Sequence, residues 1–253
     1  MPISLVGSEM CIRDRILKIG PSSMSFDGER LTVDLNERSA PFRRAIKGKV
    51  IVDMPAVTDR CYTLHSAGQH RWWPIAPTAR VKVSLDAPNV RWEGAGYVDT
   101  NGGTVALEDT FTDWHWSRAD MGPENCRIVY EAHARDGETC LMTLFGGPKT
   151  GLASEHSPPR RDLTAGPIWR VSRPARSHQG FNVEKTLEDT PFYTRSHLYD
   201  ASGNSVMHES LDLDRFAAPW VQRLLPFRMR KIFYGLANAG DSRVTVPFSK
   251  SLK

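Results

Sequence analysis

The sequence predicts an all-β protein of two antiparallel β-barrel or sandwich domains, with one short helix near the C-terminus. From Ile16 onward, apolar and polar residues alternate over much of the chain. Gly, Pro, Asn and Asp interrupt this alternation about every 8–12 residues, which is typical of short strands joined by tight turns. Apolar residues with helical spacing first occur near Asp212.

Several strands follow directly from this pattern. Alternating or wholly apolar runs predict strands at residues 30–35, 49–52, 80–85, 126–134, 139–145, 168–171 and 182–187. The Asp136-Gly137 pair between two of these runs predicts a hairpin. Near the C-terminus, Asp212 or Asp214 is expected to cap a helix that ends at Pro226. The apolar face of that helix consists of Phe216, Trp220, Val221, Leu224 and Leu225.

The predicted domain boundary lies at residues 146–166, which are rich in Gly, Pro, Ser and charged residues. This linker places the first domain at residues 16–150 and the second at residues 165–253. Residues 1–15 have neither a strand nor a helix pattern, and they lack the parts of a secretory signal. They resemble a translated sequencing adapter, so we interpret them as a non-native tail that leaves the first domain truncated at its start.

Composition excludes several classes of function. The 33 basic and 29 acidic residues give a net charge of +4, too small to predict binding of nucleic acid. No apolar run approaches the roughly 18 residues that a membrane-spanning helix needs. The four cysteines form no CxxC pair, and the chain has no dinucleotide- or phosphate-binding glycine motif. We therefore expect free thiols in a reducing, cytoplasmic compartment and neither a metal nor a redox cofactor.

One cluster of polar residues has the spacing of a proton-transfer site. Tyr97, Asp99 and Asn101 alternate along the chain, so on a strand they project from one face. An aspartate in apolar surroundings is driven toward its neutral form and can then donate a proton. The alternative is a turn, because Asp99, Asn101 and the glycines that follow are common turn residues and Asp99 could accept backbone N–H bonds.

A second cluster is aromatic. Five of the seven tryptophans are Trp72, Trp73, Trp92, Trp114 and Trp116. Such rings can stabilise a nearby cation, but ordinary core packing is the commoner reason for them. The pair Glu108 and Asp109, and also His115, are weaker candidates for acid–base chemistry.

Several motifs together resemble the carotenoid 1,2-hydratase family, also called hydroxyneurosporene synthases. The resemblance spans about residues 19–235. Its motifs include GYVDTNGG at 96–103, FTDWHWSR at 111–118, TLEDTPFYTRS at 186–196, HESLDLDRF at 208–216 and HRWWPIAP at 70–77, with shorter matches at 19–22, 107–108 and 225–229. The family normally has a further segment before the position of Ile16.

The resemblance implies two lipocalin-like domains and a cofactor-independent enzyme. The expected reaction is acid-catalysed addition of water to the terminal 1,2 double bond of neurosporene, lycopene or a related acyclic carotenoid. Asp99, Tyr97 and Trp72 are the implied catalytic residues, with Trp73 as the alternative tryptophan. The expected substrate-binding residues are Trp73, His70, Trp92, Asn101, Trp114, Trp116, Phe192 and Tyr193.

Two other functions fit such a fold. A lipocalin-like pericyclase would use the shape of its cavity rather than a proton donor, and a carotenoid or lipid carrier would use Asp99 only structurally. The expected location is the cytoplasm, with peripheral contact at the inner membrane allowed. The basic run from Arg223 to Lys231, beside Leu224, Leu225 and Phe227, could contact anionic lipid.

Overall fold

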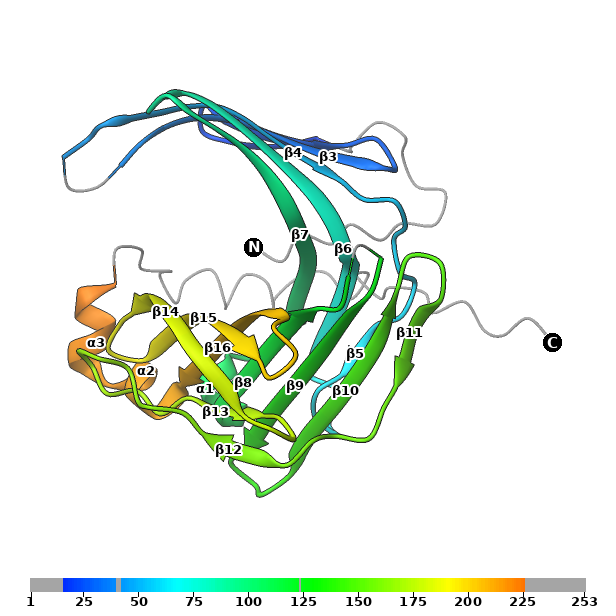
Figure 1. The fold of residues 1–253 in the computed structure, drawn as a ribbon. Coiled ribbons are helices and arrows are strands. Elements are labelled where there is room, and N and C mark those ends of the chain that lie inside the picture. The colour runs from blue at the N-terminus through cyan, green and yellow to red at the C-terminus, as the bar shows by residue number, and fades with distance from the viewer. Residues whose placement is uncertain (1–15, 40–41, 123, 226–253) are drawn as a thin grey trace.

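The computed structural model describes residues 16–39, 42–122 and 124–225 (Figure 1). The predicted non-native tail and the chain beyond Leu225 lie outside the described residues. The interpretation of residues 1–15 as non-native and the expected end of the helix at Pro226 therefore stay predictions. The described chain forms two large antiparallel sheets, which we call the upper and the lower sheet from their places in Figure 1.

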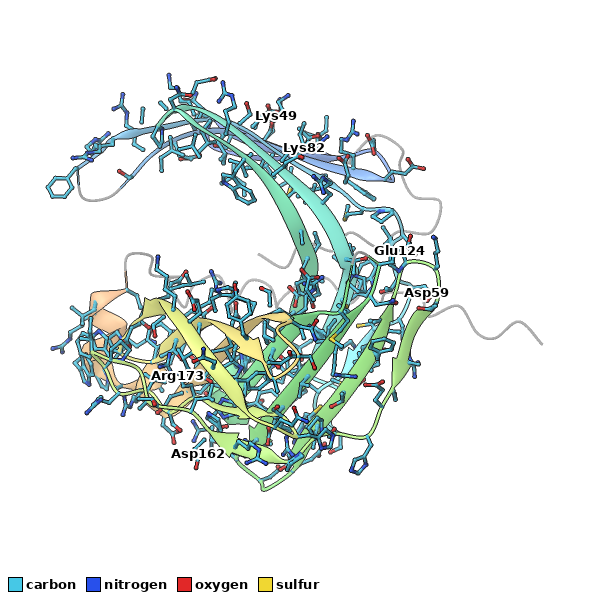
Figure 2. The ribbon with its side chains drawn as sticks, viewed as in Figure 1. Lys49, Asp59, Lys82, Glu124, Asp162 and Arg173 are labelled. Carbon is cyan, nitrogen blue, oxygen red and sulfur yellow. The ribbon has the colours of Figure 1, made fainter. Side chains whose placement is uncertain are left out.

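The upper sheet has seven strands in the order β1-β2-β3-β4-β6-β5, and β7 also pairs with β6. Its strands are β1 (Ile16–Ile19), β2 (Ser22–Phe26), β3 (Arg30–Arg38), β4 (Ala45–Asp53), β5 (Tyr62–Thr63), β6 (His70–Ala87) and β7 (Val90–Gly103). Lys49 and Lys82, which Figure 2 labels on this sheet, are exposed, as expected for the polar positions of strands with one solvated face.

The lower sheet also has seven strands, in the order β11-β10-β9-β8-β16-β15-β14. Its strands are β8 (Phe111–Asp120), β9 (Cys126–Ala134), β10 (Thr139–Gly147), β11 (Gly151–Ser154), β14 (Phe181–Asp189), β15 (Tyr193–Asp200) and β16 (Ser205–Asp212). A separate ribbon pairs β12 (Arg160–Asp162) with β13 (Pro174–Arg176). The helices are α1 (Leu107–Thr110), α2 (Leu213–Ala217) and α3 (Pro219–Leu224).

The hairpin of β6 and β7 links the two halves and bends between them (Figure 1). Its register shifts twice, between Trp73 and Ala76 and again between Ala76 and Ala79. Each shift contains a proline, Pro74 or Pro77, which has no N–H to donate to a ladder. Extra residues of this kind bend a strand and change the direction of its side chains. The bend therefore brings the middle of β7 against the lower sheet.

Two hydrophobic clusters follow from this arrangement. The larger lies between the hairpin and the lower sheet, and its fully buried members include Trp72, Phe111, Ile128 and Tyr130. The smaller belongs to the upper sheet and is formed by Val52, Met54, Ile75 and Ala76. Neighbouring residues of β6 thus belong to different clusters, as the alternation of side chains along a strand requires.

The all-β prediction is confirmed, although the described strands do not close into a barrel. Strands occur at six of the seven predicted runs, and β9 coincides with the predicted residues 126–134. Because β8 pairs with β16, strands from both sides of the predicted linker share the lower sheet. The expected boundary at residues 146–166 includes β11 of that sheet and β12 of the separate ribbon.

The strand expected at residues 168–171 is wrong. These residues form a turn in which Arg170 has a φ of 56°, and the Asp189 carboxylate accepts the Ile168 N–H at 2.6 Å. The predicted C-terminal helix exists but is divided into α2 and α3. Asp212 caps α2 by accepting the Arg215 N–H, and Ala218 is extended because Pro219 follows it.

Candidate active site

The side chain of Asp99 receives two hydrogen bonds from the predicted partners. Strand β7 includes residues 97–101, so the alternative of a turn at this position is not what the structure contains. The indole Nε1–H of Trp72 donates to Asp99 Oδ2 at 2.8 Å, and the Tyr97 hydroxyl donates to the same oxygen at 3.1 Å. The predicted catalytic residues Asp99, Tyr97 and Trp72 are therefore in direct contact.

This arrangement distinguishes the two oxygens of Asp99. Oδ2 is engaged by both donors, so a proton bound to the neutral carboxyl group belongs on Oδ1. Burial raises the pKa of Asp99, and this outweighs the opposing effect of the hydrogen bonds from Trp72 and Tyr97. Among the described residues, Asp99 forms no ion pair with an arginine or lysine that would hold it ionised.

Aromatic rings surround this carboxyl group. The Trp72 ring lies 5.0 Å from that of Tyr130 and 5.5 Å from that of Tyr62. The Tyr97 ring lies 5.1 Å from that of Trp116. Burial raises the pKa of Tyr97 and of Tyr130 well above that of a solvated phenol, so both hydroxyls stay protonated as hydrogen-bond donors.

Asn101, the third residue of the polar cluster, contacts the site indirectly. It is exposed, and its Oδ1 accepts a hydrogen bond from the Tyr130 hydroxyl at 3.1 Å. Tyr130, which packs against Trp72, was not predicted. It lies on β9, 31 residues beyond Asp99, so the sequence contained no local spacing that connects the two. Only the pairing of β9 with β8 brings it to the hairpin.

Arg118 is a second residue that the sequence did not predict. Its buried guanidinium donates through Nε to the carbonyl oxygen of Pro77 at 2.9 Å, which ties β8 to the bend of β6. The same guanidinium lies 6.0 Å from the centre of the Tyr97 ring. Arg118 therefore fixes the bent hairpin, and with it Tyr97, to the lower sheet.

The predicted tryptophans take different positions. Trp116 is buried beside Tyr97, and the ring of Trp114 lies 6.1 Å from that of Tyr130, so both belong to the aromatic surroundings of the site. Trp73 packs against the smaller cluster and donates to the Thr58 carbonyl at 2.8 Å. Trp92 pairs with Val83 on the upper sheet and is 52% exposed, so the structure does not bring it to Asp99.

The other predicted binding residues lie at the margins of the larger cluster. His70 is buried against Phe111, and its Nε2 lies 2.9 Å from the Thr110 hydroxyl. Burial lowers the pKa of His70, which keeps the ring neutral. Phe192 and Tyr193 are partly buried at the edge of the same cluster. Their expected contacts with a substrate remain predictions.

Two groups of side chains in the described part of the chain could hold a metal ion. One consists of Asp113, His115 and His133, and the other of His65, Asp136 and Glu138. Neither group includes Asp99. The sequence did not suggest either, because each combines a pair of residues two positions apart with a third residue from a distant segment.

The fold and the site define an all-β protein that holds a partly buried acid among aromatic rings. The sequence matches the family described as carotenoid hydratase CrtC over residues 7–233, and the chain belongs to that family. This confirms the resemblance that the motifs indicated.

Several proteins named acyclic carotenoid 1,2-hydratase are similar to this chain in sequence, which is consistent with its membership of the family. The chain is 42% identical over 221 residues to an acyclic carotenoid 1,2-hydratase of Thiocapsa roseopersicina, covering 85% of this chain and 54% of that protein. It is 39% identical to the protein of that name from Rubrivivax gelatinosus, covering 83% and 53%. For the protein from Cereibacter sphaeroides the identity is 35%, with 84% and 77% covered. The chain thus spans about half the length of the first two relatives.

Among solved structures, a candidate AttH protein from Nitrosomonas europaea is similar at a TM-score of 0.49 and 9% identity. The match covers 78% of this chain and 70% of that one.

Proposed function

We propose that this chain is an acyclic carotenoid 1,2-hydratase in which Asp99 is the acid that starts the reaction. The supporting observation is the environment of Asp99. Its pKa is raised by burial, two donors engage Oδ2, and Oδ1 is left to carry the proton. Family membership and the names of the relatives support an acyclic carotenoid as the substrate class. Neurosporene and lycopene are the members of this class that the motif resemblance implies.

The proposed reaction begins with transfer of the Asp99 Oδ1 proton to C2 of the terminal double bond. The π electrons of that bond form the new C–H bond and leave a tertiary cation at C1. The faces of the aromatic rings around the carboxyl group, above all that of Trp72, stabilise this cation. Water then adds to C1, and ionised Asp99 takes its proton. The alkene gains one water, and the enzyme returns to its starting state.

Trp72 and Tyr97 have a second role in this cycle. Once the proton has left, the Trp72 N–H and the Tyr97 O–H stabilise the negative charge of Asp99 without any rearrangement. The site therefore supports the neutral acid through burial and the carboxylate through hydrogen bonds. A carboxyl group that must alternate between both forms needs both contributions.

The experiment that tests this proposal is incubation of the purified chain with lycopene or neurosporene without oxygen, metals or nucleotides. Analysis of the pigments by mass should show a product heavier by one water. The product formed in ¹⁸O-labelled water should carry the ¹⁸O at C1. Recovery of unchanged carotenoid bound to the protein would instead identify a carrier, and an isomer of unchanged mass would identify a cyclase.

We also infer that the protein makes peripheral contact with the cytoplasmic face of a membrane, because acyclic carotenoids dissolve in the bilayer. No helix among the described residues is long and apolar enough to cross a bilayer. Supporting surface contact, Trp169 and Trp220 stack at 5.9 Å and are 40% and 48% exposed, beside Ile168 and Leu224 at 74% and 63%. Exposed tryptophan and aliphatic side chains are typical of surfaces that lie in a membrane interface.

Sedimentation with phosphatidylglycerol vesicles tests this contact. The variant Trp220→Ser should bind the vesicles more weakly, while Trp92→Ser, which removes an exposed tryptophan on the upper sheet, should bind like the parent chain. Equal binding by all three proteins would contradict the assignment. Most of the predicted basic run that follows Arg223 lies outside the described residues, and it is the same in all three proteins.

A further inference from the structure

A cluster of ionisable side chains lies on the face of β8 and β9 opposite to Asp99. Along β8, Asp113 and His115 alternate with Trp114 and Trp116, so they point away from the aromatic site. The pairing of β8 with β9 places His133 directly across from Asp113. Two neighbouring strands thus deliver one carboxylate and two imidazoles to the same face.

The ligand atoms of these three residues converge. Asp113 Oδ1 lies 3.0 Å from His115 Nε2 and 2.7 Å from His133 Nδ1, and all three atoms lie within 4.8 Å of one another. The side chains of Asp113 and His133 are 31% and 26% exposed, whereas that of His115 is 7% exposed. The convergence point is therefore held from inside by His115 and is open to solvent beside the other two.

Each histidine is also oriented by a polar partner on its second ring nitrogen. His115 Nδ1 lies 2.9 Å from the Ser210 hydroxyl, and His133 Nε2 lies 3.3 Å from Glu131 Oε1. Glu131 is itself fixed by Arg176, which donates to both carboxylate oxygens at 2.8 Å. Histidines that bind metals almost always have such partners, which select the tautomer and aim the free nitrogen.

The neighbours of His133 indicate how a cation would enter this arrangement. Arg160 Nη1 lies 3.4 Å from His133 Nε2, and His133 Nδ1 lies 2.7 Å from Asp113 Oδ1. A neutral ring that accepts from Arg160 on Nε2 carries its proton on Nδ1 and donates it to Asp113. A divalent cation would displace that proton and bind both Nδ1 and Oδ1.

We propose that Asp113, His115 and His133 bind a divalent cation of the zinc class. Two imidazole nitrogens and one carboxylate oxygen are ligands that zinc accepts, and solvent at the open side can supply the fourth. The ion would join β8 to β9 and is separated from Asp99 by the strands themselves. It is therefore a structural site, independent of the hydration chemistry proposed above, and it differs from the sequence expectation that the chain has no metal site.

Cobalt is the probe for this site, because tetrahedral Co²⁺ with nitrogen ligands absorbs visible light strongly. The full chain, freed of metal with a chelator, is titrated with CoCl₂ and then with ZnCl₂. We expect a tetrahedral spectrum at one equivalent of Co²⁺, its loss on addition of Zn²⁺, and a higher melting temperature with either ion. Absence of this spectrum would overturn the proposal and leave the cluster as a hydrogen-bonded network only.

Variants locate the ion. His133→Gln, at a partly exposed position, should weaken Co²⁺ binding at least tenfold, and Asp113→Asn is a second variant if the first does not fold. The matched control is His65→Ala, which removes a histidine from the other candidate group, His65, Asp136 and Glu138. A spectrum that persists unchanged in His133→Gln and Asp113→Asn, or that is lost in His65→Ala, would also overturn the assignment.

Discussion

Two carboxyl groups that lie on opposite faces of β8 and β9 have pKa values shifted in opposite directions. On the face toward the bent hairpin, Asp99 lies among aromatic rings, and burial raises its pKa. On the other face, the hydrogen bonds and positive charges of Arg176 and Arg160 lower the pKa of Glu131, although the Glu131 side chain is itself buried. The difference shows that burial alone does not decide whether a carboxyl group stays neutral. The presence or absence of a cationic partner decides it.

Only the first of these environments suits an acid catalyst. Glu131 is a carboxylate in a completed ion pair, so it holds no proton to give near neutral pH. Asp99 has donors on one oxygen and no cationic partner among the described residues, so it can hold a proton and also carry the charge that remains.

Replacing the acid should abolish most of the activity. Asp99→Asn keeps the size and an acceptor oxygen but has no proton of suitable acidity, so hydration of lycopene should fall by about a thousandfold. The control Asp109→Asn changes an exposed aspartate of α1 and should retain full activity. The product is measured by mass under anaerobic conditions. Retention of activity in Asp99→Asn would show that another group donates the proton.

Breaking the ion pair on the other face should affect stability rather than chemistry. Glu131→Gln leaves the largely buried guanidinium of Arg176 without a charged partner and should lower the free energy of unfolding by about 3 kcal/mol. Glu188→Gln, which breaks a pair with Arg195 at the surface, should cost about 0.5 kcal/mol. Urea denaturation measures both. Equal losses would mean that the depth of the ion pair has no effect.

Removing one donor from Asp99 should move the pH dependence of the reaction. Trp72→Phe keeps an aromatic ring but deletes the N–H that lowers the pKa of Asp99, so that pKa should rise further. The acid form would then persist to higher pH, and the falling alkaline limb of kcat/KM would shift upward. The rate itself should fall by about tenfold, the effect of one hydrogen bond to a charged group. A limb that shifts downward would contradict this account.

The two carboxyl groups should also give opposite pH dependences of stability. The folded pKa of Asp99 is raised, so Asp99 costs stability as pH rises above the unfolded value of 3.8, and Asp99→Asn should gain relative to the parent chain over that range. The folded pKa of Glu131 is lowered, so its contribution is present above the unfolded value of 4.5 and is lost as pH falls. Denaturation at several pH values compares both variants with the parent.

The sequence predicted the parts of the site that lie close together along the chain. Alternation indicated that Tyr97 and Asp99 share one face if their segment is a strand, although it left a turn as the alternative, and the Asp136-Gly137 pair correctly indicated the hairpin of β9 and β10. The assignment of Trp72 rather than Trp73 rested on the family resemblance. Alternation cannot decide which of two neighbouring residues faces the site when the register of the strand is unknown.

What the sequence could not predict depends on pairings between distant segments. Tyr130 reaches Trp72 only because β9 lies beside β8, and His133 meets Asp113 for the same reason. The turn at residues 168–171 depends on the carboxylate of Asp189, about twenty residues away. The division of the C-terminal helix had a local signal, because Pro219 disfavours a helical conformation at Ala218.

The two register shifts of β6 have a consequence for how the length of this chain can change during evolution. Loss or gain of one residue between Trp73 and Ala79 would exchange the two faces for every residue on one side of the change. Trp72 would then turn toward the upper cluster, and Asp99 would lose its indole donor although neither residue had been replaced. Insertions and deletions should therefore accumulate in turns such as that at Gly137, while β6 keeps a constant length among active relatives.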